Sequence, residues 1–142
     1  LECLHRELLS LVMKGVRKEQ KKIGIKRFIN SFRYSWDGLK YAFHYEQSMF
    51  VHVLVTILVI ICGIVVKLNT QEWLLCIILI GLVIATELIN TAIEAVVDLA
   101  CPKIHPLAKT AKDTASAAVF VFAITAVICG LLIFVPNLLE LL

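Results

Sequence analysis

Three long apolar segments dominate the pattern of hydrophobic and polar positions along the chain. The apolar runs begin near residues 50, 73 and 115, and with their flanking residues they predict spans over about 48–67, 72–99 and 106–135. A helix needs about 20 apolar residues to cross the hydrocarbon core of a bilayer. Because backbone groups in lipid must be bonded within their own segment, we expect all three segments to be α-helices.

A fourth helix is predicted over about 25–45, and its pattern is amphipathic. Its apolar side chains share an arc of about 80° on a helical wheel, and polar side chains lie opposite. The apolar set is Phe28, Phe32, Trp36, Leu39 and Phe43, and the polar set is Arg33, Asp37, Lys40 and His44. Such a helix is expected to lie in the plane of the membrane surface, with its cations towards anionic headgroups. A soluble helix packed on a core is the weaker alternative, because the sequence shows no soluble core elsewhere.

These elements predict an all-α integral membrane protein with three transmembrane helices and an N-terminal amphipathic surface helix. Residues 1–24 form a basic N-terminal extension, disordered or partly helical, residues 25–136 the membrane domain, and residues 137–142 a C-terminal tail. The composition agrees with this class, since 60% of the 142 residues are hydrophobic and the mean hydropathy is +0.89. The five cysteines are scattered without a CxxC pair and are interpreted as small apolar residues.

The net charge of +3 is unevenly distributed, and its position predicts the orientation in the membrane. Lysine and arginine concentrate before the first span and in the loop after the second, whereas the loop between the first two spans holds only Lys67. By the positive-inside rule, the N-terminus and the second loop are cytoplasmic and the C-terminus is outside.

Polar residues interrupt the second apolar segment in a regular way. Glu87, Asn90, Glu94 and Asp98 are spaced i, i+3, i+7 and i+11, which confines them to an arc of about 80° on a helix. This spacing predicts one polar row open to the cytoplasm, with Glu87 deepest and Asp98 nearest water. Hydrogen bonding between helices is an alternative role. With Glu46 before the first span, however, the carboxylates make a negative excess that suits Mg²⁺, although nearby lysines could also neutralise it.

The loop and helix start after the second span complement these acids. Pro106 is expected in the first turn of the third span, followed by Lys109 and Lys112, and a helix N-terminus with lysines favours polyphosphate. The chain has no GxxxxGK[ST] loop, no GxGxxG motif and no kinase HRD or DFG motif. A nucleotide would therefore be held by metal and lysine on membrane helices.

Four sequence segments resemble the bacterial membrane diacylglycerol kinase family, which includes the undecaprenol kinases of Gram-positive bacteria. The segments are RFINSFRYSWDGLKYAFHYE, ELINTAIEAVVD, HPLAKTAKD and ASAAV, and the resemblance extends over about residues 25–136. It implies a homotrimeric bundle in the bacterial cell membrane, with sites shared between subunits and no nucleic-acid partner. It also implies phosphorylation of a lipid alcohol, undecaprenol or diacylglycerol, at the cytoplasmic surface, with Mg²⁺ as cofactor and ATP as co-substrate.

The resemblance also implies roles for individual residues. Glu87 matches the general base, and Glu46 and Glu94 match the metal ligands. The positions that match nucleotide-binding residues are Arg27, Tyr34, Glu46, Asn90, Glu94, Lys103, Ile104, His105, Lys112 and Asp113. The positions that match the lipid-binding surface are Arg27, Ser31, Ser35, Trp36, Glu87 and Ser116.

One position bears on the choice of lipid. His52 lies six residues after Glu46, where enteric members of the family have a second carboxylate, and this difference favours undecaprenol over diacylglycerol. Two non-kinase interpretations of the acids are also considered. A small ion-coupled channel or transport subunit would conduct ions without ATP, and a non-enzymatic membrane scaffold would need the acids only for assembly.

Overall fold

The computed structural model describes residues 24–101 and 105–141. This part of the chain forms four helices, α2 (Ile25–Tyr45), α3 (Gln47–Val65), α4 (Thr70–Ala100) and α5 (Pro106–Leu141). The all-α prediction is confirmed for these residues. The chain divides into two compact units, one ending at Gly38 and the other beginning at Leu39, and each is described by itself.

Three of the helices, α3, α4 and α5, are long and apolar enough to cross a membrane. The shortest, α3, has 19 residues, and at about 1.5 Å per residue it approaches the roughly 30 Å of a bilayer core. Leu54, Leu58 and Ile61 of α3 are exposed, as are many aliphatic side chains of α4 and α5. Exposed apolar surface of this extent suits contact with lipid.

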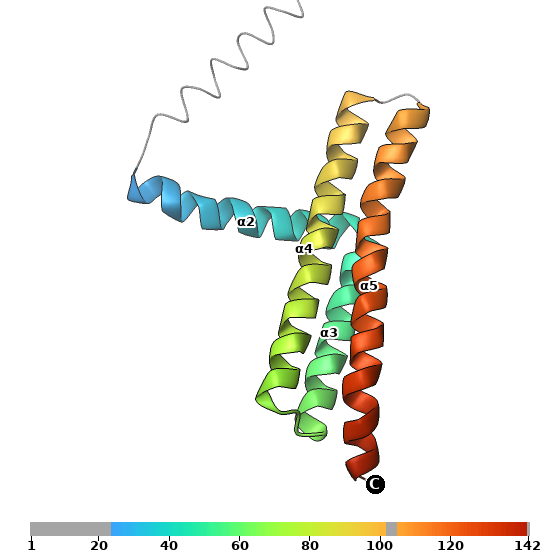
Figure 1. Cartoon of the computed structure of the whole chain (residues 1–142). Coiled ribbons are helices and arrows are strands. Elements are labelled where there is room, and N and C mark those ends of the chain that lie inside the picture. Colours follow the sequence, from blue (N-terminus) through green and yellow to red (C-terminus); the bar gives the residue numbers. More distant parts are fainter. Residues whose placement is uncertain (1–23, 102–104, 142) are drawn as a thin grey trace, which may run out of the picture. The chain divides into compact units, whose positions relative to one another are not determined.

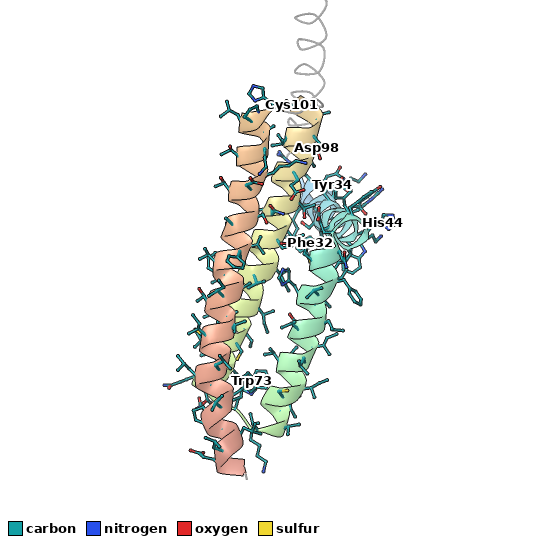
Figure 2. All side chains as sticks on the ribbon, turned by 90° about the vertical axis from the view of Figure 1, so that its right-hand side faces the viewer. Phe32, Tyr34, His44, Trp73, Asp98 and Cys101 are labelled. Atoms are coloured by element: carbon teal, nitrogen blue, oxygen red, sulfur yellow. The ribbon has the colours of Figure 1, made fainter. Side chains whose placement is uncertain are left out.

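The second unit has two distinct ends (Figure 1). At one end the turn of residues 66–69 joins α3 to α4 and lies beside the last turns of α5; we call this the turn end. At the other end α4 finishes and α5 begins; we call this the acidic end, because Glu94 and Asp98 lie there on α4. Figure 2 shows Trp73 towards the turn end of α4, and Asp98 and Cys101 at the acidic end.

The turn end contains a small, closely packed core. Leu68, Cys76 and Ile133 are buried there, and Trp73 packs against them. Gly63 of α3 passes close to this group, since a Cβ atom at position 63 would lie 2.8 Å from the Trp73 ring. The close approach of α3 to α4 therefore depends on glycine at this position.

Polar contacts complete the turn end. Asn69 caps α4, with its side chain accepting hydrogen bonds from the backbone amides of Gln71 and Glu72. Glu72 accepts from the Asn69 backbone amide at 2.8 Å, which closes a capping box. Asn137 of α5 donates its Nδ2 to the other Glu72 oxygen at 2.8 Å and thereby fixes α5 to the start of α4.

In the first unit, the described residues form the greater part of α2. The Phe28 and Phe32 rings meet edge to face with their centroids 5.2 Å apart. The hydroxyls of Ser31 and Ser35 donate to the backbone oxygens of Arg27 and Ser31, one turn earlier. These serines therefore satisfy their hydrogen bonds within the helix.

Candidate active site

A buried carboxylate, Glu87 of α4, is the centre of the candidate site. Glu87 is only 3% exposed, and burying an ionised carboxylate requires polar partners. Ser48 of α3 donates its hydroxyl to Oε1 of Glu87, and the Nε2 atom of His52 lies 3.8 Å from Oε2. The two carboxylate oxygens thus face two different side chains of the neighbouring helix.

The contacts from α3 follow from a regular spacing that the sequence interpretation did not use. Ser48, His52 and Thr56 are four residues apart and share one helical face in an otherwise apolar segment. The first two face Glu87, whereas the Thr56 hydroxyl donates to the His52 backbone oxygen at 2.8 Å. The predicted site omitted Ser48, although this four-residue spacing was a signal that could have identified it.

On α4 the polar row becomes more exposed towards the acidic end. Glu87 and Asn90 are buried, Glu94 is partly buried, and the Asp98 side chain is 66% exposed. This order agrees with the depth predicted from the spacing. Asn90 donates its Nδ2 to Glu94 Oε1 at 3.0 Å, while its own buried Oδ1 has no hydrogen-bond partner within the described residues.

Glu46 brings a further carboxylate towards this row. It is the N-cap residue of α3, is partly buried, and makes no side-chain capping bond. Burial raises the pKa of the Glu46 carboxyl above its ordinary value, and the charges of Glu94 and Glu87 raise that pKa further. Lys112 opposes the shift and lowers the pKa. Carboxylates from α3 and α4 therefore interact unfavourably in the absence of a cation.

This donor set fits a hard divalent cation that is shared with a ligand. Carboxylate oxygens suit Mg²⁺, which commonly takes only one or two of them and completes its shell with water and substrate phosphates. Over residues 24–101 and 105–141, no group of three or more His, Cys, Asp or Glu side chains is arranged to hold a metal ion.

The start of α5 carries the basic side chains. Pro106 is the first residue of α5, as predicted, and the preceding His105 accepts a hydrogen bond at Nδ1 from the Leu107 amide at 3.2 Å. Lys112 lies 2.6 Å from Asp98 Oδ1 and joins α5 to α4. Asp98 had no assigned role in the sequence interpretation, and this ion pair supplies one.

Several predicted site residues are not brought to Glu87 by the described contacts. Lys103 and Ile104 lie outside the described residues. Asp113 pairs with Lys109 on α5, and Ser116 is exposed on the same helix. The remaining ones belong to the first unit, which is described separately: Arg27, Ser31, Tyr34, Ser35 and Trp36.

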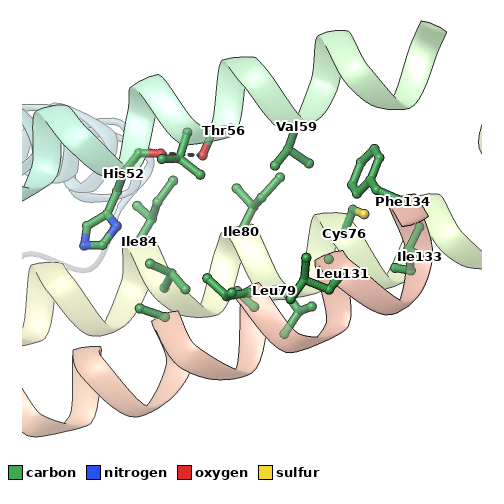
Figure 3. Close-up of a pocket in the computed structure, with 16 residues that line it drawn as sticks. His52, Thr56, Val59, Cys76, Leu79, Ile80, Ile84, Leu131, Ile133 and Phe134 are labelled. Carbon is green, nitrogen blue, oxygen red and sulfur yellow. Dashed lines mark hydrogen bonds between the residues drawn. The ribbon is translucent and has the colours of Figure 1, made fainter. Parts of the chain in front are cut away.

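An apolar pocket of about 350 Å³ lies between α3, α4 and α5. Its walls are mainly aliphatic and include Val59, Leu79, Ile80 and Phe134 (Figure 3). His52 also lines this pocket while its Nε2 atom faces Glu87. His52 is therefore both a wall of the pocket and a neighbour of the buried carboxylate.

Comparison with known proteins shows the family of this chain. The sequence profile of the prokaryotic diacylglycerol kinases matches residues 33–134, well over half of the chain. The chain belongs to this family.

Family members with similar sequences are named either undecaprenol kinase or diacylglycerol kinase. An undecaprenol kinase of Bacillus subtilis is 45% identical over 114 residues, which cover 80% of this chain and 93% of that protein.

Two other members of the family are named diacylglycerol kinases. The Synechocystis protein is 40% identical over 112 residues, covering 78% of this chain and 64% of that protein. The Escherichia coli K12 protein is 35% identical over 105 residues, covering 74% of this chain and 86% of that protein. The diacylglycerol kinase family therefore includes relatives named for two different lipid alcohols.

Proposed function

We propose that this protein is a kinase that transfers the γ-phosphoryl group of ATP to the hydroxyl of a membrane lipid, with Mg²⁺ as cofactor. The observation that carries the proposal is a buried carboxylate, Glu87, whose neighbour His52 lines an apolar pocket between spanning helices. A lipid hydroxyl needs a base inside the membrane boundary, and its hydrocarbon chain needs an apolar surface. Family membership supports the same activity.

In this mechanism Glu87 is the general base. Its carboxylate accepts the proton of the lipid hydroxyl as the hydroxyl oxygen attacks the γ-phosphorus, and ADP leaves with the electrons of the broken bond. Asn90 holds Glu94 through its amide and keeps that carboxylate oriented. Glu46 and Glu94 would hold Mg²⁺, which neutralises charge on the phosphates when it is bound with the nucleotide.

Lysine supplies the remaining positive charge. Lys112 is paired with Asp98, and we propose that it turns to the phosphates when ATP binds. The other proposed nucleotide contacts are Arg27, Tyr34, Lys103, Ile104, His105 and Asp113. The proposed lipid surface adds Arg27, Ser31, Ser35, Trp36 and Ser116.

The proposed assembly is a homotrimer, with sites shared between subunits, in the bacterial cell membrane. The proposed arrangement has α2 in the membrane surface, the N-terminus in the cytoplasm and the C-terminus outside. The distribution of lysine and arginine supports this orientation. Accessibility of single cysteines introduced at Lys67 and Lys109 to an impermeant thiol reagent would test it, since only position 67 should react in intact cells.

Undecaprenol is the proposed lipid. Two features support this choice. Position 52 is a histidine, where enteric members of the family have a second carboxylate, and the chain is 45% identical to the Bacillus subtilis undecaprenol kinase. A side-by-side assay of both lipid alcohols in the same detergent tests it. We expect a higher kcat/KM for undecaprenol, and a preference for diacylglycerol would reverse the assignment.

The kinase activity itself is tested by transfer of labelled phosphate from ATP to either lipid. Glu87→Gln should lower kcat by about 100-fold or more, because general base catalysis commonly contributes that much. Glu72→Gln is the matched control, since Glu72 is a partly buried glutamate on the same helix but at the turn end. It should keep near wild-type turnover.

Each contrary result has a definite meaning. Wild-type turnover by Glu87→Gln would remove Glu87 as the base while leaving the kinase assignment intact. No transfer by the wild-type protein to either lipid would overturn the kinase assignment. Ion flux through liposomes without ATP would instead favour a channel or transport subunit.

A further inference from the structure

The two side chains of α3 that flank Glu87 have no part in the mechanism above. Ser48 donates its hydroxyl to Oε1, and His52 faces Oε2 at 3.8 Å. They lie one turn apart on the same face of α3. The contacts therefore distinguish the two oxygens of one carboxylate.

The unequal contacts indicate which oxygen is available to a substrate. Oε1 already accepts a hydrogen bond from the Ser48 hydroxyl. The distance of 3.8 Å between His52 Nε2 and Oε2 exceeds a hydrogen bond. A hydroxyl oxygen about 2.8 Å from each of these atoms fits this separation, and it would then bridge them.

We propose that the reacting lipid hydroxyl binds between Oε2 of Glu87 and Nε2 of His52, and that Ser48 positions the carboxylate for this contact. The inference rests on the proposed role of Glu87 as general base. His52, carrying its proton on Nε2, donates to the hydroxyl oxygen, and Oε2 accepts the hydroxyl proton. His52 is then a residue that touches the substrate, whereas Ser48 acts through Glu87.

The group transfer balances without any additional reactant. The hydroxyl proton passes to Oε2, the new oxygen–phosphorus bond forms, and the bond between the γ-phosphorus and ADP breaks with its electron pair leaving on ADP. His52 keeps its proton throughout and orients the attacking oxygen. Protonated Glu87 then releases its proton to water after the products leave.

The position of His52 also relates the hydroxyl to the hydrocarbon chain. Its ring lines the apolar pocket, beside Thr56 and Ile84 in Figure 3. A lipid whose hydroxyl lies at Nε2 can place its first carbon atoms against this ring and the following ones along the aliphatic wall. This geometry suits a primary alcohol attached to a long apolar chain.

The first experiment compares His52→Leu with His52→Gln in the full-length protein, using undecaprenol and ATP in detergent micelles. Leucine removes the donor, so we expect kcat/KM for the lipid to fall about 10- to 100-fold with the KM for ATP unchanged. Glutamine restores an N–H donor of similar reach and should recover activity to within a few-fold of wild type. A general loss of structure would not be rescued in this way and would change both KM values.

The second experiment compares Ser48→Ala with Ser48→Thr under the same conditions. Alanine removes the hydroxyl that holds Oε1, so kcat should fall about 10-fold, and threonine should restore it. Thr125→Val is the matched control, because its hydroxyl also lies on a spanning helix but donates to the Val121 backbone oxygen, and Thr125 does not line the apolar pocket. It should leave both KM values unchanged.

The outcomes separate this inference from the proposed function. If wild-type protein phosphorylates the lipid and His52→Leu retains its kcat/KM, the inferred hydroxyl contact is wrong while the kinase assignment stands. Equal losses in His52→Leu and His52→Gln with wild-type ATP binding would also overturn the donor role. If no lipid alcohol is phosphorylated by the wild-type protein, the proposed function itself fails.

Discussion

Two glutamates of α4 have different surroundings: Glu72 lies at the turn end, and Glu87 lies midway along the helix in the direction of the acidic end. At the turn end, Glu72 accepts hydrogen bonds at both carboxylate oxygens, from the Asn69 amide and from Asn137. Glu87 is more deeply buried; among the described residues Ser48 donates a hydrogen bond to its Oε1, whereas His52 Nε2 lies 3.8 Å from its Oε2. Both carboxylate oxygens of Glu72 are thus hydrogen-bonded within the fold, whereas Oε2 of Glu87 has no such bond among the described residues.

The same difference extends to the neighbouring residues. The turn end is closely packed around Trp73, and its polar groups cap and connect helices. The acidic end has the buried Asn90 oxygen without a partner in the described residues and carboxylates that raise the pKa of Glu46. Unsatisfied buried polar groups cost stability and recur at functional sites. The turn end therefore stabilises the bundle, while the polar groups towards the acidic end are less fully satisfied within the described residues.

The largest expected effect is at Glu94. Glu94→Gln should lower activity by about 100-fold at limiting Mg²⁺, because loss of groups that merely support metal ligands already costs 10- to 100-fold. Titration of the kinase rate with Mg²⁺ measures this effect, and excess metal should recover part of the rate. Glu72→Gln, the corresponding change at the turn end, should leave the Mg²⁺ dependence unaltered.

An unaltered Mg²⁺ dependence in Glu94→Gln would remove it from the metal site. A change in subunit assembly without any loss of Mg²⁺ or nucleotide binding would support a scaffold role for the acids. Both results would weaken the contrast between the two ends.

Gly63 provides the largest expected effect at the turn end. In Gly63→Ala the added Cβ would lie 2.8 Å from the Trp73 ring, and overpacking of this kind costs about 1–3 kcal/mol. The thermal midpoint in detergent should fall by several degrees, with the turnover of the folded protein retained. Gly81→Ala is the matched control, because a Cβ there meets no atom within 4 Å; its midpoint should stay unchanged or rise. Equal behaviour of the two variants would contradict close packing at Gly63.

The contact between Asn137 and Glu72 should have an effect on stability of comparable size. Asn137→Ala removes a hydrogen bond to a carboxylate at 2.8 Å, which is worth about 1–3 kcal/mol. The thermal midpoint should fall without a change in the KM for ATP. Combined with Glu72→Ala, the two losses should be less than additive, since the substitutions remove the same contact. Fully additive losses would show that the two residues act independently.

The smallest effect is expected from the pH dependence at Glu46. Because its pKa is raised in the folded protein, the charged carboxylate destabilises the fold above that pKa, and the penalty vanishes once both folded and unfolded states are protonated. Without Mg²⁺, Glu46→Gln should melt a few degrees higher than wild type near neutral pH. The difference should shrink as the pH falls towards the ordinary value of 4.5. A difference that grows in acid would have the wrong sign for a raised pKa.

Local patterns in the sequence predicted much of the helical structure. The apolar runs corresponding to α3, α4 and α5, Pro106 at the start of α5, and the increase in exposure from Glu87 to Asp98 follow from composition and helical periodicity. These features depend on residues close together in the chain, so one helix suffices to derive them. The predicted contribution of α2 residues such as Arg27 and Trp36 to the site stays a prediction.

Contacts between distant residues were decided only by the tertiary structure. The sequence alone determined that the acids form one row on an apolar helix, because helical periodicity fixes which residues share a face. It did not determine that Ser48 and His52 face Glu87. Nor did it determine that Lys112 pairs with Asp98, or that Asn137 donates a hydrogen bond to Glu72. These contacts depend on how neighbouring helices are rotated and aligned, and side-chain packing such as that of Gly63 against Trp73 helps to set that alignment.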